Sequence, residues 1–345
     1  FLENMFVATN HQYMMFFTQK GKCYWMRVYE IPEGSKTAKG RAIQNLVNIE
    51  SDDKVKAFIC TQDLKDKDYV NSHNLIMVTK QGQVKKTSLE KYSKPRANGV
   101  AAITIKEGDE LLEAKLTNGE SQIILAVKSG KLVRFEETKT RPMGRTASGV
   151  RGITLKDETD EVIGMVTVDK DDINDSQILV VTENGYGKRT KLVDEDGEDV
   201  YRITNRGGKG VKTLNITEKT GKLISISAVT DADDLMIINK SGLTIRMAVE
   251  DLRVMGRATQ GVKLINLKGT DSIAAVTKVM KDEVAEVVVD EDGNVIETEA
   301  IERVKPVLEV LEDDGVEDED EDDSEEDEIE DEEDDNSADE DDDSE

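Results

Sequence analysis

The segment Ile178-Leu179-Val180-Val181-Thr182-Glu183-Asn184-Gly185-Tyr186-Gly187-Lys188-Arg189-Thr190 carries the strongest structural signal in this chain. Its run of aliphatic and β-branched residues predicts a buried strand. Asn184-Gly185 is a residue pair that tight hairpin turns favour, and a second strand with basic side chains follows it. The segment therefore predicts a β-hairpin.

The hairpin pattern occurs five times along the sequence. Apolar runs at 14–18, 75–79, 123–127, 178–182 and 235–239 lead into Gly21, Gly82, Gly130, Gly185 and Gly242. A second glycine marker follows each hairpin, at Gly40, Gly99, Gly149, Gly210 and Gly261. Both markers advance together, by 48 to 61 residues from one copy to the next. Two markers in one register indicate an internal repeat.

Repeats of about 50–60 residues built from short strands are the size of propeller blades. One small sheet cannot bury both of its faces, whereas sheets stacked beside each other can. We therefore expect an all-β, propeller-like fold of four-stranded blades over residues 1–300. The repeats fall near 1–68, 69–115, 116–170, 171–228 and 229–280. A solenoid of parallel strands is the second possible architecture, although its repeats are usually shorter.

Charge is distributed very unevenly along the chain. The formal net charge is −28, yet residues 312–345 contain 26 Asp and Glu residues and no Lys or Arg. The remaining residues, 1–311, are therefore close to neutral. A segment rich in carboxylates and poor in apolar residues cannot offset its ordering entropy. We expect residues 301–345 to form a disordered acidic tail.

The sequence supplies no catalytic constellation. His11 and His73 are the only histidines, and neither falls in a metal-ligand motif. The segment Gly185–Thr190 fails as a phosphate-binding loop because Arg189 stands where Ser or Thr must follow Gly-Lys. We therefore predict no catalytic residue and no metal site. Cys23 and Cys60 match no zinc spacing and indicate a reduced, cytoplasmic compartment, and we expect neither a signal peptide nor a membrane span.

Basic residues recur with the repeat, and this recurrence predicts a nucleic-acid surface. Equivalent positions in successive blades lie at equivalent places, so recurring cations would form a belt that follows a phosphate backbone. The residues that we predict for this belt are Lys22, Arg27, Lys85, Lys86, Arg96, Lys131, Arg134, Arg145, Lys188, Arg189, Arg246 and Arg257.

The loop Thr204-Asn205-Arg206-Gly207-Gly208-Lys209-Gly210 differs from its counterparts in the other repeats. Three glycines free the backbone for close approach to a phosphate, while Arg206 and Lys209 supply charge. We include Arg206, Gly207, Gly208, Lys209 and Gly210 among the predicted DNA-binding residues. A tight turn with no ligand is the alternative interpretation of this loop.

Several of these motifs resemble the C-terminal domain family of DNA gyrase A, a six-bladed β-pinwheel. The resemblance rests on Gly185–Thr190, on Met143-Gly144-Arg145 with Gly149–Ile153, and on Met255-Gly256-Arg257 with Gln260-Gly261-Val262. Residues 206–210 are similar to the family's signature box, although Thr204 and Asn205 depart from it and the box normally lies in the first blade. The start at Phe1 resembles the sequence just after that box. We therefore expect a fragment that lacks the N-terminal breakage-reunion domain and most of the first blade.

The resemblance implies that duplex DNA wraps around this domain to support ATP-dependent negative supercoiling. It also implies a gyrase holoenzyme of two A and two B subunits, with ATP and Mg²⁺ bound elsewhere and no cofactor in this chain. The corresponding domain of topoisomerase IV is one alternative, since that domain lacks an intact box. A propeller that serves as a scaffold for other proteins is the second alternative.

The acidic tail generates the first prediction. If the tail competes with DNA for the basic surface, removal of residues 312–345 should tighten DNA binding, most visibly at low salt. Titration of labelled duplex with the complete and the shortened chain across salt concentrations measures this effect. Equal affinities at every salt concentration would remove the idea of competition.

Overall fold

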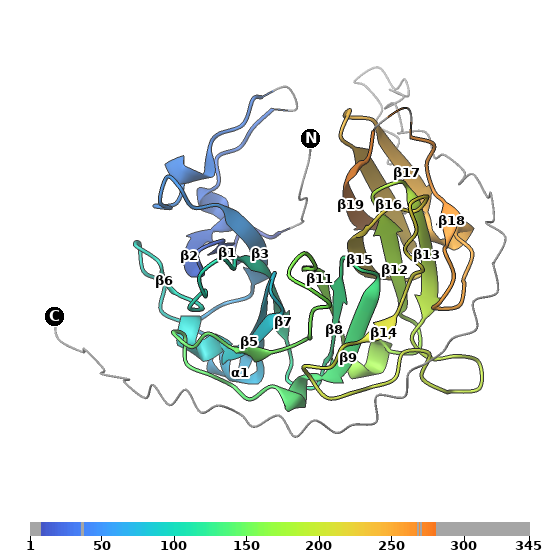
Figure 1. Cartoon of the computed structure of the whole chain (residues 1–345). Coiled ribbons are helices and arrows are strands. Elements are labelled where there is room, and N and C mark those ends of the chain that lie inside the picture. The colour runs from blue at the N-terminus through green and yellow to red at the C-terminus, as the bar shows by residue number, and fades with distance from the viewer. Residues whose placement is uncertain (1–7, 36–37, 268, 270, 281–345) are drawn as a thin grey trace, which may run out of the picture. The chain divides into compact units, whose positions relative to one another are not determined.

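The computed structural model of this chain describes residues 8–35, 38–267, 269 and 271–280. Within these residues the fold is all-β and propeller-like, as predicted, with five small antiparallel sheets (Figure 1). The predicted acidic tail at 301–345 lies outside the described residues. No helix in the described part of the chain is long and apolar enough to cross a membrane.

Four of the sheets contain four strands each. In order across each sheet, these are β3 (Val55–Thr61), β1 (Tyr13–Thr18), β2 (Lys22–Arg27) and β6 (Val100–Ala101); β7 (Leu111–Thr117), β4 (Asn74–Thr79), β5 (Gln83–Ser88) and β10 (Val150–Arg151); β11 (Val162–Val168), β8 (Gln122–Val127), β9 (Lys131–Glu136) and β14 (Val211–Lys212); β15 (Leu223–Val229), β12 (Gln177–Thr182), β13 (Tyr186–Lys191) and β18 (Val262–Lys263).

The fifth sheet has three strands among the described residues: β19 (Ile273–Met280), β16 (Asp233–Asn239) and β17 (Thr244–Ala248). Helical elements are short. They are α1 (Lys67–Ser72) and the 3-10 turns Val28–Glu30, Ile43–Asn45, Leu89–Tyr92, Glu137–Lys139, Lys170–Asp172 and Val249–Asp251. Asp66 caps α1, because its carboxylate accepts hydrogen bonds from the amides of Asp68 and Tyr69.

Four of the five central strands, β1, β4, β8 and β12, divide their buried side chains between two cores. In β12, Ile178 and Val180 enter the core shared with β8, whereas Leu179 and Val181 enter the core shared with β16. All six residues of β12 are buried. A strand that is buried on both faces has an uninterrupted run of apolar residues in its sequence. The hairpins could be predicted from the sequence because their first strands are of this kind. Neighbouring sheets are thus held together by alternate residues of the same strands.

The fourth strand of each complete sheet comes from the following repeat. β6, β10, β14 and β18 each follow the next hairpin in sequence but pair with the outer hairpin strand of the preceding sheet. The blades have four strands, as predicted, but the four strands of each complete sheet come from two repeats. A repeat contributes three strands to its own sheet and exchanges a fourth with its neighbour. This exchange covers an edge that would otherwise expose unpaired backbone groups.

Glycine is required where the exchanged strand meets the preceding hairpin. Gly210 has a φ of 74°, and a Cβ added to it would lie 2.5 Å from the carbonyl oxygen of Leu132. The second glycine marker of the sequence thus marks the point of exchange. Only glycine offers both the left-handed backbone and the close approach.

Two alanine substitutions distinguish the cost of the left-handed backbone from the cost of the close approach to Leu132. Gly210→Ala should lower the free energy of unfolding by about 2–4 kcal/mol, through left-handed strain plus overlap with Leu132. Gly197→Ala, at a φ of 85° with open space around it, should cost only about 1–2 kcal/mol. Urea denaturation of both variants gives the comparison. Equal losses would show that the contact with Leu132 contributes nothing.

Candidate nucleic-acid interface

The exchanged strands and the chain leading into them form four equivalent segments, which we term the exchange loops: residues 93–101, 140–151, 201–212 and 252–263. Each loop ends in its two-residue strand at the outer edge of a sheet (Figure 1). The register is the same throughout, since Ala101, Arg151, Lys212 and Lys263 pair with Lys22, Gln83, Lys131 and Tyr186. The fold therefore repeats one surface element on four consecutive sheets.

The exchange loops contain cations and no carboxylates. Acidic residues make up 74 of the 345 residues of the chain, yet none falls in these four loops. Most loop positions are exposed or half-buried. A stretch of chain whose charged side chains are all positive attracts a polyanion. The twelve cations are Lys94, Arg96, Arg141, Arg145, Arg151, Arg202, Arg206, Lys209, Lys212, Arg253, Arg257 and Lys263.

Backbone hydrogen bonds connect the residues that follow each exchange loop to the next exchange loop. The amide of Thr104 donates to the carbonyl of Ala147 at 3.2 Å, and the amide of Thr154 donates to the carbonyl of Gly208 at 3.0 Å. The next contact in the series runs from the amide of Asn215 to the carbonyl of Thr259, at 3.2 Å. These bonds link each cationic loop, through a residue three positions after its end, to the next loop in the series.

The glycine-rich loop at 204–210 is one member of this series. The amide of Gly207 donates to the carbonyl of Gly152 at 2.7 Å, and the hydroxyl of Thr154 donates to the carbonyl of Gly207 at 2.6 Å. The Nε of Arg206 donates to the carbonyl of Lys139, the residue just before the preceding exchange loop, at 3.2 Å. The backbone of Gly207 is thus bound to the preceding repeat, at a φ of 85° that glycine adopts readily.

Most of the predicted cations that follow the hairpin glycines are buried inside the fold. Lys85 and Lys188 have no exposed surface, and Lys86, Arg134 and Arg189 are at most 6% exposed. A buried cation needs internal partners. Lys86 forms a 3.0 Å ion pair with the buried Glu137. These five side chains therefore do not contribute to a DNA surface, and the predictions for them are corrected.

The arginines of this group link strands and turns within the fold. Arg134 donates to Gln122, to the carbonyl of Tyr201 and to the carboxylate of Asp199. Arg189 binds the carbonyl of Leu252 and pairs with Asp231, and Arg246 pairs with the buried Asp234 at 2.8 Å. DNA binding by Arg246 stays a prediction, since its guanidinium is engaged inside its own sheet while its side chain is 16% exposed.

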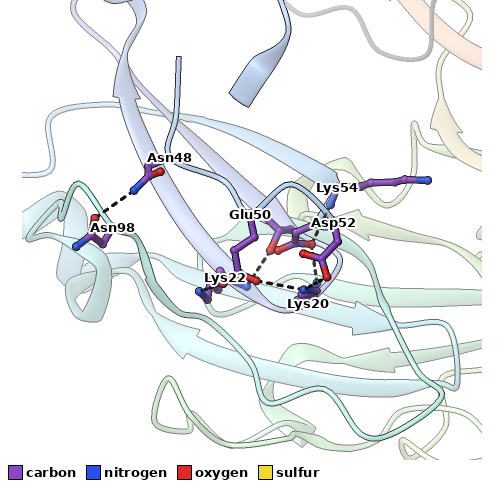
Figure 2. Close-up of polar contacts among 9 residues, drawn as sticks. Lys20, Lys22, Asn48, Glu50, Asp52, Lys54 and Asn98 are labelled. Carbon is purple, nitrogen blue, oxygen red and sulfur yellow. Dashed lines mark hydrogen bonds and ion pairs between the residues drawn. The ribbon is translucent and has the colours of Figure 1, made fainter. Parts of the chain in front are cut away.

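Lys22 and Arg27 have local partners. Figure 2 shows Lys22 and Lys20 turned toward the carboxylate of Glu50, with Lys22 Nζ 2.5 Å from it. Arg27 lies over the ring of Tyr13, 3.6 Å from its centre, and donates to the carbonyl of His11. Both side chains are half-buried. Neither residue lies in an exchange loop.

The remaining predicted residues do lie on or beside the exchange loops. They are Arg96, Arg145, Arg206, Gly207, Gly208, Lys209, Gly210 and Arg257, with Lys131 directly across the sheet from Lys212. Sequence reasoning missed Lys94, Arg141, Arg151, Arg202, Lys212, Arg253 and Lys263. The absence of carboxylates from these four stretches is the signal that could have found them.

The buried ammonium of Lys85 generates a prediction about pH. Burial, together with the nearby charge of Arg145, lowers the pKa of Lys85 to about 7 in the folded chain, whereas an unfolded lysine titrates near 10.4. Between these values the unfolded chain binds more protons, so stability rises with pH. The free energy of unfolding of the native chain, relative to that of Lys85→Met, should therefore increase from pH 7 to pH 10.

Urea denaturation at several pH values measures this difference. Lys170→Met, at an exposed lysine, is the matched control and should show no such trend. A pH-independent difference between the native chain and Lys85→Met would contradict the lowered pKa.

The chain is similar in sequence to known proteins. A family model described as the DNA gyrase C-terminal domain, β-propeller, matches residues 12–62, 73–118, 122–169, 176–230 and 233–280. DNA gyrase A of Staphylococcus aureus strain MRSA252 is 40% identical over 306 residues, and that of strain NCTC 8325 / PS 47 is 40% identical over 309. Each alignment covers 87% of this chain and 33% of the relative. The chain thus spans about a third of the length of these relatives.

Solved structures share the fold. The C-terminal domain of DNA topoisomerase IV superposes with a TM-score of 0.68 at 24% identity, over 79% of this chain and 80% of that one. The DNA gyrase A C-terminal domain superposes with a TM-score of 0.64 at 23% identity, over 79% and 84% of the two chains. At these identities the likeness supports the architecture alone.

Proposed function

Because this chain belongs to the family of DNA gyrase C-terminal β-propeller domains, we propose that it binds duplex DNA along its exchange loops and curves it. The observation that carries the proposal is the series of four exchange loops that contain twelve cations and no carboxylates, each linked to the next by a hydrogen bond from a residue just after the loop. The bound DNA would follow these loops from one sheet to the next.

The free-energy cost of bending DNA can be compared with the number of phosphate contacts that the loops offer. Curving 20–30 base pairs smoothly by 40–90° costs on the order of 1–6 kcal/mol. One or two phosphate contacts would not hold such a curve. Several contacts that each release condensed counterions would hold it, and they would make binding strongly dependent on salt. Because backbone contacts carry no sequence information directly, the chain would bend DNA with little preference for sequence.

The function of the complete protein is part of the same proposal. We infer a type II topoisomerase, with gyrase favoured over topoisomerase IV because the relatives at 40% identity are gyrase A proteins. In this proposal the chain wraps DNA in the cytoplasm to support negative supercoiling. DNA cleavage and ATP hydrolysis belong to other parts of an assembly of two A and two B subunits. No catalytic role is proposed for residues of this chain.

Three exposed arginines at equivalent loop positions test the proposal. Arg141, Arg202 and Arg253 each lie eight residues before the glycine of their exchange loop. Replacing all three with Gln should weaken duplex binding and reduce the slope of log affinity against log salt by up to about 0.9 per lost contact. The variant should also change the linking number of relaxed plasmid less than the native chain does.

The matched control replaces three exposed lysines outside the loops, Lys65, Lys67 and Lys170, with Gln. This control removes the same charge and should retain nearly the native salt slope. Equal slopes for the native chain and the loop variant would refute DNA binding along the exchange loops. Equal losses for the loop variant and the control would indicate unspecific attraction.

A further inference from the structure

Two buried lysines contact the exchange loops from inside the fold. Lys85 and Lys188 are the third residues after their hairpin glycines, and neither has exposed surface. Lys85 Nζ donates to the carbonyls of Ala102 at 2.7 Å and Arg145 at 2.5 Å. Lys188 Nζ donates to the carbonyls of Gly256 and Arg257, both at 2.5 Å, and to the hydroxyl of Thr259 at 3.1 Å.

The two loops held in this way share a sequence. They contain Met143-Gly144-Arg145 and Met255-Gly256-Arg257, and the lysine binds the arginine carbonyl in both cases. The loops at 93–101 and 201–212 lack this Met-Gly-Arg turn. The strands at the ends of these two loops pair with hairpins that have Tyr24 and Val133 at the position of the lysine. Lysine at this position therefore occurs together with the Met-Gly-Arg turn.

The fold itself does not require lysine at this position. Tyr24, Val133 and Ile245 occupy it in the other three repeats, and all three are buried. Burying an ammonium group is costly unless it is fully hydrogen-bonded, so an apolar side chain would fill the site at a lower cost. The specific property that lysine adds is a set of hydrogen bonds to backbone carbonyls of the turn.

We propose that Lys85 and Lys188 are positioning residues, which fix the Met-Gly-Arg turns so that Arg145 and Arg257 are presented to DNA phosphates. The inference rests on the proposed function, since the phosphates are those of the curved duplex. The carbonyls of each turn are drawn inward, onto Nζ, which fixes the backbone beside the arginine. A backbone ordered before binding loses less conformational entropy when DNA arrives.

The first experiment tests the positioning without DNA. Hydrogen exchange is measured at the amides of 143–147 and 255–259 in the complete chain and in Lys85→Met with Lys188→Met. The variant should exchange faster at these amides and remain unchanged at 201–212, whose hairpin carries Val133. Val133→Met is the matched control and should leave 143–147 and 255–259 as in the native chain. Unchanged exchange in the lysine variant would overturn the proposal.

The second experiment tests the link to DNA by a double-mutant cycle. The lysine pair is changed to Met, the arginine pair Arg145 and Arg257 to Gln, and then all four together. Each pair alone should weaken duplex binding about 10-fold or more at 0.1 M salt and lower the salt slope by up to about two units. The four changes together should weaken binding no further than the arginine changes alone.

A purely structural role for the lysines predicts additive losses, and additivity would overturn the proposal. If Lys85→Met prevents folding, Lys188→Ile takes its place, because Ile245 occupies the equivalent position in the fifth repeat. If the native chain does not bind duplex DNA, the proposed function fails, together with the inference about phosphates. The exchange experiment still decides whether the lysines hold the turns.

Discussion

The fold depends on the exchange of a short strand between neighbouring repeats. Each complete sheet takes its fourth strand from the sequence that follows the next hairpin. The exchanged strand pairs with the backbone N–H and C=O groups at the outer edge of the preceding hairpin. It also brings the exchange loop to that edge. A hydrogen bond from a residue just after each loop then links it to the next loop. Strand exchange thus links the repeats and also places the cations on consecutive sheets.

Two populations of basic residues follow from this arrangement. Those on the second strand of the hairpins lie between packed sheets, where a charge is tolerated only with hydrogen-bonded partners. Glu137, Asp234 and the backbone carbonyls of the loops supply these partners. Those on the exchange loops lie in carboxylate-free stretches at the outer edges. The near-neutral total of residues 1–311 therefore says little about the surface that DNA would meet.

The sequence predicted the hairpins and their number because continuous apolar runs and glycine turns are strong local signals. It did not predict strand exchange, since a two-residue strand such as Val150–Arg151 has no periodicity to detect. It also assigned Lys85, Arg134 and Lys188 to the surface, because a basic residue next to a turn usually lies in solvent. Each of these buried side chains donates to a backbone carbonyl of an exchange loop, which is a tertiary contact. The DNA-binding prediction for the box-like loop stays a prediction, and two of its glycines, Gly207 and Gly210, lie against the preceding repeat.

The most direct test of this account is a map of which residues lie beside bound DNA. A photo-activated cross-linker is placed in turn at Arg96, Arg141, Arg202 and Arg253 in the exchange loops, and at Asn118, Glu158 and Asp171, which are exposed outside them. The account predicts cross-links to duplex DNA from all four loop positions, at successive points along one DNA molecule, and few from the other three. Equal cross-linking from both sets, or cross-linking from a single loop only, would contradict it.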